Sequence, residues 1–216
     1  MSGPEERARA DPARRRIGRG ADAEGGAPSD VALLTGIGDG SEEAFNLFFD
    51  RWAPRLGRFL LRATGSRETS EDLLHEVFLR VLRAAPRFEP KGSVTAWMFR
   101  IGANVLYSDW RRRRASPVVS IETLEPAALP IAVEEDQETR RVQRRFARDA
   151  RAALTKISEN HRVVFHLKVE EGLTYAEIAA VLGCPIGTAK SRFHHAVREL
   201  RSLLEEWGDL ESPQRR

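Results

Sequence analysis

The segment from Gly172 to Leu200, GLTYAEIAAVLGCPIGTAKSRFHHAVREL, constrains the fold more than any other part of the chain. Thr174 stands three residues before Glu177, which is the spacing of a capping box. In that motif the two side chains satisfy backbone N–H groups at the start of a helix. Gly183 suits a left-handed residue at the end of this helix, and Pro185 suits the beginning of the next one. The pattern predicts a helix, a tight turn and a second helix.

The second of these helices has one apolar face and one face of hydrogen-bond donors. Ala189, Phe193 and Leu200 can face inward, while the other side carries Lys190, Ser191, Arg192, His194, His195 and Arg198. Such a face suits phosphate oxygens and base edges in the major groove of DNA. An ordinary helical hairpin with a solvated basic face is the alternative.

Elsewhere the chain divides into two helical blocks. Residues 1–30 hold almost no large apolar side chains, which predicts a disordered extension, and residues 208–216 form a tail. Residues 115–139 contain prolines and only acidic charges, which is typical of a flexible linker. No alternation typical of strands persists anywhere. We therefore expect an all-α protein with two small helical domains, residues 31–114 and 140–207, the second containing the helix-turn-helix.

Within the first block, local signals mark three helical segments. Ser41 is a plausible helix start, Pro54 separates two apolar groups, and Gly65 closes the segment. Ser70 is then expected to open an amphipathic helix, and Ser93 to begin another that reaches the arginine run at 111–114.

That last helix carries a stripe of aromatic, amide and guanidinium side chains at spacings of three and four, namely Trp97, Arg100, Asn104, Tyr107, Arg111 and Arg114. Side chains of these types can stack on unpaired bases and hold their backbone. Two alternatives stay open here: Trp97 can be a core residue, and the arginines can form a solvated helix end.

Taken together, AFNLFFDRWAPRLGRFLLRATGSRETSEDLLHEVFLRVLRAAPRFEPKGSVTAWMFRIGANVLYSDWRRRR and ISENHRVVFHLKVEEGLTYAEIAAVLGCPIGTAKSRFHHAVREL resemble a bacterial sigma factor of the extracytoplasmic function (ECF) group of the sigma-70 family. The resemblance implies that SEDLLHEVFLRVLR docks on a coiled coil of the largest subunit of core RNA polymerase through Asp72, His75, Glu76 and Leu79. It also implies that TAWMFRIGANV melts promoter DNA.

The same resemblance assigns the DNA-reading residues. It places Phe88, Arg100 and Asn104 at the minus-ten element, to which the stripe described above adds Trp97, Tyr107 and Arg111. Lys190, Ser191, Arg192, His194, His195 and Arg198 are expected to read the minus-thirty-five element. Three positions depart from the family pattern: His75 replaces a glutamine, Val94 an aromatic residue, and His195 an arginine.

The expected function is therefore transcription initiation, with core RNA polymerase, promoter DNA and an anti-sigma factor as partners. A stand-alone helix-turn-helix regulator is the alternative, but it leaves Asp72–Leu79 and the stripe at 97–114 without a role. An enzyme is not expected, because no nucleophile motif, phosphate-binding glycine loop or metal-ligand spacing is present, and neither a metal nor a cofactor is expected. The lack of a signal sequence and the single cysteine, Cys184, predict a cytoplasmic protein.

Overall fold

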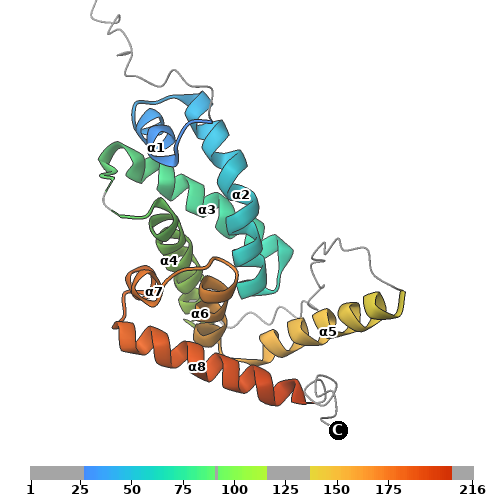
Figure 1. Ribbon diagram of the computed structural model, residues 1–216. Helices are drawn as coiled ribbons and strands as arrows, with labels where there is room; N and C mark the ends of the chain where they lie inside the picture. The colour runs from blue at the N-terminus through green and yellow to red at the C-terminus, as the bar shows by residue number, and fades with distance from the viewer. Residues whose placement is uncertain (1–26, 91, 116–136, 206–216) are drawn as a thin grey trace, which may run out of the picture.

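The computed structural model describes residues 27–90, 92–115 and 137–205, and everything described in it is helical or irregular (Figure 1). The predicted N-terminal extension up to residue 26, most of the predicted linker (116–136) and the tail from residue 206 lie outside the described residues. Helices α1–α4, which we call the N-terminal module, are α1 (Asp30–Gly38), α2 (Glu42–Thr64), α3 (Arg67–Ala84), the short 3₁₀ helix η1 (Ala85–Arg87) and α4 (Val94–Ala115). The C-terminal module comprises α5 (Gln137–Lys156), α6 (Glu159–Val169), α7 (Tyr175–Leu182) and α8 (Ile186–Leu203).

Side-chain caps and glycines set most of the helix ends. The hydroxyl of Ser41 accepts a hydrogen bond from the Ala44 amide, 3.2 Å away, and Gly65 ends α2 with a φ of 74°, a left-handed conformation that favours glycine. Ser93 accepts from the Ala96 amide at the start of α4. These three boundaries confirm the sequence-based predictions.

One boundary prediction was wrong. Helix α3 begins at Arg67 rather than Ser70, because Ser66 lies three residues before Thr69 and accepts its amide hydrogen at 3.2 Å. Ser70 is instead a buried residue of the helix, whose hydroxyl donates to the Arg67 carbonyl. Pro54, which separates the two apolar groups of the first predicted segment, lies inside α2, and the helix runs through it. Pro54 and Asp50 are both exposed, so water can reach the carbonyl that the proline leaves without its amide donor.

The core of the N-terminal module is rich in aromatic rings. Phe48 and Trp52 of α2 are buried together, and Phe99 of α4 meets Phe59 of α2 edge to face, with 5.3 Å between ring centroids. Helix α1 packs on α2 and η1 through Leu33, Leu34 and Ile37. Helix α4 is thereby held with one side in the core and the other available for contacts outside the module.

The C-terminal module contains the predicted hairpin. The Thr174 amide donates to Glu177 Oε2 at 2.8 Å, and the Glu177 amide donates to Thr174 Oγ1 at 3.2 Å, so the capping box is present. Gly183 ends α7 with a φ of 61°, and Pro185 immediately precedes α8. Helix α8 crosses α6 and α7, as Figure 1 shows. The sequence-based prediction of helix, tight turn and helix is confirmed.

The two modules pack against each other. Helix α7 lies on α4 and α6 lies against the end of α2. One cluster of buried apolar side chains includes Leu106 and Trp110 of α4 as well as Ile178 and Val181 of α7. The sequence did not predict this contact, which shapes the surfaces described below.

Candidate nucleic-acid and polymerase surfaces

The face of α3 predicted to bind polymerase is open to solvent. Asp72, His75 and Leu79 are exposed, and Leu79 is 47% exposed, a large fraction for a leucine. Glu76 is half-exposed and accepts a hydrogen bond from Nε of Arg80 at 2.7 Å. Helix geometry therefore presents two carboxylates, an imidazole and an apolar side chain along α3.

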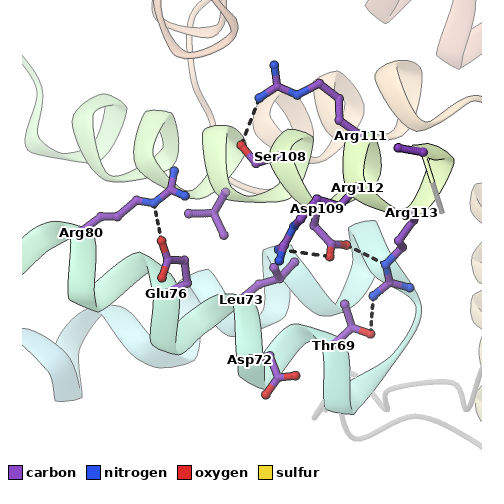
Figure 2. A pocket seen from close by; sticks show the side chains of 12 residues that line it. Thr69, Asp72, Leu73, Glu76, Arg80, Ser108, Asp109, Arg111, Arg112 and Arg113 are labelled. Carbon is purple, nitrogen blue, oxygen red and sulfur yellow. Dashed lines mark hydrogen bonds and ion pairs between the residues drawn. The ribbon is translucent and has the colours of Figure 1, made fainter.

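A groove of about 860 Å³ runs between α3 and α4 beside this face. Figure 2 shows Asp72 and Glu76 on α3 at one edge and the side chains of Asp109, Arg112 and Arg113 at the other. Arg113 lies 2.8 Å from Asp109 Oδ2, an ion pair that is not aligned as a hydrogen bond, and it donates to Thr69 Oγ1 at 2.7 Å. Arg113 thus ties the end of α4 to the start of α3.

The side chains of the arginine run at the end of α4 point in three different directions and have different partners. Arg112 and Arg113 pair with Asp109 in the groove, whereas Arg111 points away from α3 and donates to Ser108 Oγ at 3.2 Å (Figure 2). Arg114 pairs with Glu159 of α6. Only part of the run is therefore a solvated helix end, which was one of the two alternatives left open by the sequence.

The predicted minus-ten stripe is mostly exposed along α4. Arg100, Asn104 and Arg111 are exposed, whereas Trp97 is half-buried. The ring of Trp97 meets Phe88 edge to face, with 5.1 Å between centroids. Two of the three aromatic residues assigned to this element, Phe88 and Trp97, are therefore neighbours at one end of α4.

Tyr107 differs from the rest of the stripe. Its hydroxyl is buried and, among the described residues, has no hydrogen-bond partner. Burial raises the pKa of Tyr107, the charge of Arg192 opposes that rise, and Cys184 and Glu159 add to it. All three of those groups belong to the C-terminal module, so Tyr107 faces that module rather than open solvent.

Sequence reasoning missed three arginines beside the aromatic pair. A groove of about 620 Å³ is lined by Phe88, Trp97 and Arg100 together with Arg80, Arg83 and Arg87 from α3 and η1. The spacing of three and four between these arginines was visible in LRVLRAAPRF and marks one side of a helix. Guanidinium groups beside aromatic rings are suited to a single-stranded nucleic acid.

The outward face of α8 carries the predicted minus-thirty-five residues. Lys190, Ser191, His194, His195 and Arg198 are exposed, whereas Arg192 is half-buried toward the N-terminal module. Ser191 Oγ donates to the Thr188 carbonyl at 3.1 Å. His195 contacts Arg198 and stacks on His161 of α6 with 5.7 Å between ring centroids. Lys190 and His194 are consequently the side chains with the freest access to a ligand on this face.

A polar cluster behind α8 fixes its position on α6. His161 Nδ1 lies 3.1 Å from Glu199 Oε1, and both side chains lie partly exposed between the two helices.

Within the described part of the chain, no helix is long and apolar enough to cross a membrane.

Comparison with known protein families matches both modules. Residues 48–116 match the Sigma-70 region 2 family, and residues 147–200 match the family described as Sigma-70, region 4. RNA polymerase sigma factor CarQ of Myxococcus xanthus is 33% identical over 168 residues, which cover 78% of this chain and 93% of CarQ. ECF RNA polymerase sigma factor SigL of Mycobacterium tuberculosis is 30% identical over 179 residues, covering 82% of this chain and 98% of SigL.

Solved structures give the same result for the fold. The sigma factor RpoE from Bartonella quintana, in complex with the anti-sigma factor NepR, is 28% identical with a TM-score of 0.60, over 76% of this chain and 98% of RpoE. CnrH, in complex with the cytosolic domain of CnrY, has a TM-score of 0.58 at 24% identity, over 85% of this chain and 99% of CnrH. The chain belongs to the ECF sigma factors of the sigma-70 family, non-enzymatic proteins that direct RNA polymerase to promoters through region 2 at the minus-ten element and region 4 at the minus-thirty-five element.

Proposed function

We propose that three surfaces of this chain divide the work of promoter recognition: α3 docks core polymerase, α4 with the arginine-lined groove holds the minus-ten element, and α8 reads the minus-thirty-five element. The observation that carries the proposal is the groove at Phe88 and Trp97, where two aromatic rings and four arginines gather at the end of α4. No such arrangement is needed to pack a helical core.

The docking role of α3 is supported by what remains exposed there. A solvent-facing Leu79 next to Asp72 and His75 offers apolar area bordered by polar groups, as protein interfaces do. Glu76 is the fourth docking residue and is held in position by Arg80. In the family this surface faces a coiled coil of the largest polymerase subunit, and we assign the same partner here.

For the minus-ten element we propose that Arg100, Asn104 and Arg111 contact the DNA strand that becomes unpaired, with Phe88 and Trp97 beside it. Bases stacked on aromatic rings contribute about 1–3 kcal/mol each, without strict sequence preference. Arg80, Arg83 and Arg87 supply positive charge along the same groove. Tyr107 belongs to this set but becomes available only after the C-terminal module moves away from it.

For the minus-thirty-five element we propose that α8 enters the major groove with Lys190, Ser191 and Arg192 leading and with His194, His195 and Arg198 one turn further on. The capping box and Gly183 hold α7 and the turn that presents this face. Because His195 also touches His161 and Arg198, it has less freedom than His194 to meet a base.

We further propose that an anti-sigma factor binds this chain and that both act in the cytoplasm. The support is that RpoE from Bartonella quintana, a sigma factor of similar structure, was solved in complex with the anti-sigma factor NepR. The roles proposed above for the polymerase and DNA surfaces do not require the anti-sigma factor.

Run-off transcription tests the proposal directly. Core polymerase is incubated with a library of genomic promoter fragments, with and without the protein, and the transcripts are sequenced. We expect a restricted set of start sites, preceded by common sequences near minus ten and minus thirty-five, only when the protein is present. Tight binding to duplex DNA without polymerase, together with no new transcripts, would favour a stand-alone regulator instead.

A further inference from the structure

Four polar side chains connect α6 to the outward face of α8. Glu199 contacts His161, whose ring stacks on that of His195. Arg198 in turn contacts His195. We call these four residues the imidazole cluster. Two of its members, His195 and Arg198, are assigned to the minus-thirty-five element, whereas His161, in the first turn of α6, and Glu199 have no assigned role.

His161 is held both at its backbone and at its ring. Its amide donates to Oγ of Ser158, the N-cap of α6, at 3.3 Å. Its Nδ1 lies 3.1 Å from one carboxylate oxygen of Glu199 and 3.2 Å from the other. An ionised carboxylate only accepts hydrogen bonds, so Nδ1 of His161 carries a proton and donates to Glu199. Because the His161 side chain is only 20% exposed, neighbouring groups rather than water fix the plane of its ring.

The contact with Arg198 decides which nitrogen of His195 carries a proton. A guanidinium group donates hydrogen bonds but cannot accept them. Nδ1 of His195, which Nη2 of Arg198 contacts, is therefore the unprotonated acceptor, and Nε2 carries the only N–H of the ring. His195 thus keeps one hydrogen-bond donor for DNA, where the arginine of the family pattern would have several.

The stacked rings restrict the side chain that contacts Arg198. The rings of His161 and His195 lie at an angle of 8°, with 5.7 Å between their centroids. Arg198 is exposed, and a long side chain of this kind loses rotamer freedom when it binds a phosphate. Contact with a ring that is already held removes part of this freedom before DNA arrives, which lowers the entropic cost of binding.

The two helices do not need the imidazole cluster to stay together. A separate apolar contact includes Phe165 of α6 and the buried Ala196 and Leu200 of α8. Phe165 also stacks on Phe193 of α8, with 6.3 Å between centroids. Removal of the ring of His161 should therefore change the position of Arg198 more than the packing of α8.

We propose that His161 is a positioning residue for the minus-thirty-five element: it supports the ring of His195, which in turn holds the guanidinium group of Arg198 for a DNA phosphate. This role rests on the proposed entry of α8 into the major groove, and it adds a residue of α6 that does not itself contact DNA. The N–H groups of Arg198 that His195 does not use are available to the phosphate. Such contacts set the register of a protein on the duplex.

Anisotropy tests this role with the full-length protein bound to polymerase and a labelled duplex that carries the minus-thirty-five element identified by run-off transcription. His161→Ala removes the stacked ring and should lower affinity about fivefold. His161→Phe keeps a flat ring and should bind within about twofold of wild type. Asn160→Ala, exposed in the same turn, is the matched control and should bind like wild type. Wild-type affinity of the alanine variant, or equal losses in the alanine and phenylalanine variants, would overturn the proposal.

A double-mutant cycle separates positioning from packing. If His161 acts through Arg198, His161→Ala should cause no further loss of affinity in a protein that already carries Arg198→Ala. If His161 only packs α8 on α6, its replacement should weaken binding by the same factor with and without Arg198, and that result would also overturn the proposal. Circular dichroism verifies the helicity of each variant.

The tautomers are measured on the free wild-type chain, so this readout depends neither on a variant that folds nor on DNA. Long-range ¹H–¹⁵N NMR at mildly alkaline pH should show the Nε2–H tautomer for His195 and the Nδ1–H tautomer for His161, with signals assigned from His195→Gln and His161→Phe. The opposite tautomers would contradict the imidazole cluster.

Lys190→Ala distinguishes failure of this role from failure of the proposed function. If Lys190→Ala lowers affinity and His161→Ala does not, α8 reads the element and only the positioning role is wrong. If neither substitution changes affinity, α8 does not read the element, and the proposed function and the positioning role are both wrong.

Discussion

Arg162 of α6 donates a hydrogen bond from Nη1 to the backbone carbonyl of Ala63, 3.0 Å away near the end of α2. Its Nη2 donates to the carbonyls of Thr155 and Ile157, at 2.9 and 3.2 Å, where α5 ends. One guanidinium group thus satisfies carbonyls at the C-terminal ends of two helices, one in each module. Burial lowers the pKa of Arg162, and these carbonyls offset part of the burial cost because a cation is favoured at the negative end of a helix dipole.

Replacing Arg162 by lysine should therefore destabilise the protein. A lysine ammonium cannot reproduce a planar group that donates in two directions, and the hydrogen bonds to the three carbonyls are partly buried. We expect the free energy of unfolding in urea to fall by about 1–3 kcal/mol. Arg144→Lys, on the exposed side of α5, is the control and should change it by less than about 0.5 kcal/mol. An equal effect of both substitutions would contradict the capping role.

His166 of α6 should make stability depend on pH. The side chain is 1% exposed, and its Nδ1 lies 3.0 Å from Glu170 Oε1 without the alignment of a hydrogen bond, so neither ring nitrogen has a hydrogen-bond partner among the described residues. Burial, with smaller contributions from Arg62 and Arg162, lowers the pKa of His166 from 6.5 to about 3. The folded protein therefore holds this imidazole neutral, while the unfolded chain takes up a proton below about pH 6.5.

The sign of the effect follows from that difference. Because the unfolded state binds the extra proton, the contribution of His166 to stability is fully present above pH 6.5 and is lost as the pH falls toward 3. Between pH 7 and pH 5 the loss should be about 2 kcal/mol. Urea unfolding at both pH values measures it. His166→Leu should remove this pH dependence, whereas the exposed His194→Gln should retain it, and a wild-type profile in the leucine variant would contradict the assignment.

Charge reversal on α3 should separate polymerase binding from folding. Asp72→Lys with Glu76→Lys replaces two carboxylates of the proposed docking face, so co-purification with core polymerase should be lost while helicity is retained. Glu43→Lys with Asp50→Lys makes the same charge change on exposed positions of α2 and should leave binding intact. If immobilised polymerase retains the α3 variant as well as it retains the wild type, α3 is not the docking surface.

The arginines that line the groove at Phe88 should affect promoter melting more than polymerase binding. Arg83→Ala with Arg87→Ala removes two cations next to the aromatic pair, and the lost phosphate contacts should weaken binding of a single strand at all sequences alike. Permanganate footprinting of promoter complexes should show less unpaired thymine. Arg58→Ala with Arg67→Ala, which are exposed on α2 and at the opposite end of α3 from the groove, is the matched control. Normal footprints with the groove variant would mean that these arginines are only solvated charges.

The helix-turn-helix was predictable from sequence because its determinants are local. Thr174 and Glu177 are three residues apart, and Gly183 needs no partner beyond its own turn to adopt a positive φ. The start of α3 was not predicted correctly because Ser66 and Ser70 both suit a cap, and only the geometry of the Thr69 amide decides between them. The docking residues on α3, including the exposed Leu79, came instead from the family resemblance.

The contact between modules left no comparable trace in the sequence. Arg55 and Glu171 are separated by 115 intervening residues, and the arginine and glutamate of such a pair look like any other surface charges. The burial of Tyr107 depends on this contact and so was not predicted either. Capping signals lie within a few residues of each other in the sequence and can be recognised there. Ion pairs between distant segments can be identified only when the tertiary structure is known.

On α8, substitutions should distinguish a base contact from a phosphate contact. Lys190 is exposed on the outward face of α8, whereas Arg192 is half-buried on the side that acts on Tyr107 of the N-terminal module. Lys190→Ala and Arg192→Ala are compared in the polymerase-bound form, by anisotropy on duplexes carrying each single base change of the minus-thirty-five element. Loss of a side chain that reads a base should reduce the binding free energy by about 1–3 kcal/mol and relax the preference at one position, whereas loss of a phosphate contact should weaken binding to every duplex equally.

The two histidines of α8 are compared in the same assay. His195→Ala should reduce affinity less than His194→Ala, because His195 is held by His161 and Arg198 while His194 is not stacked on α6. If all these variants keep wild-type affinity and preference, α8 does not enter the groove and the hairpin serves to dock protein.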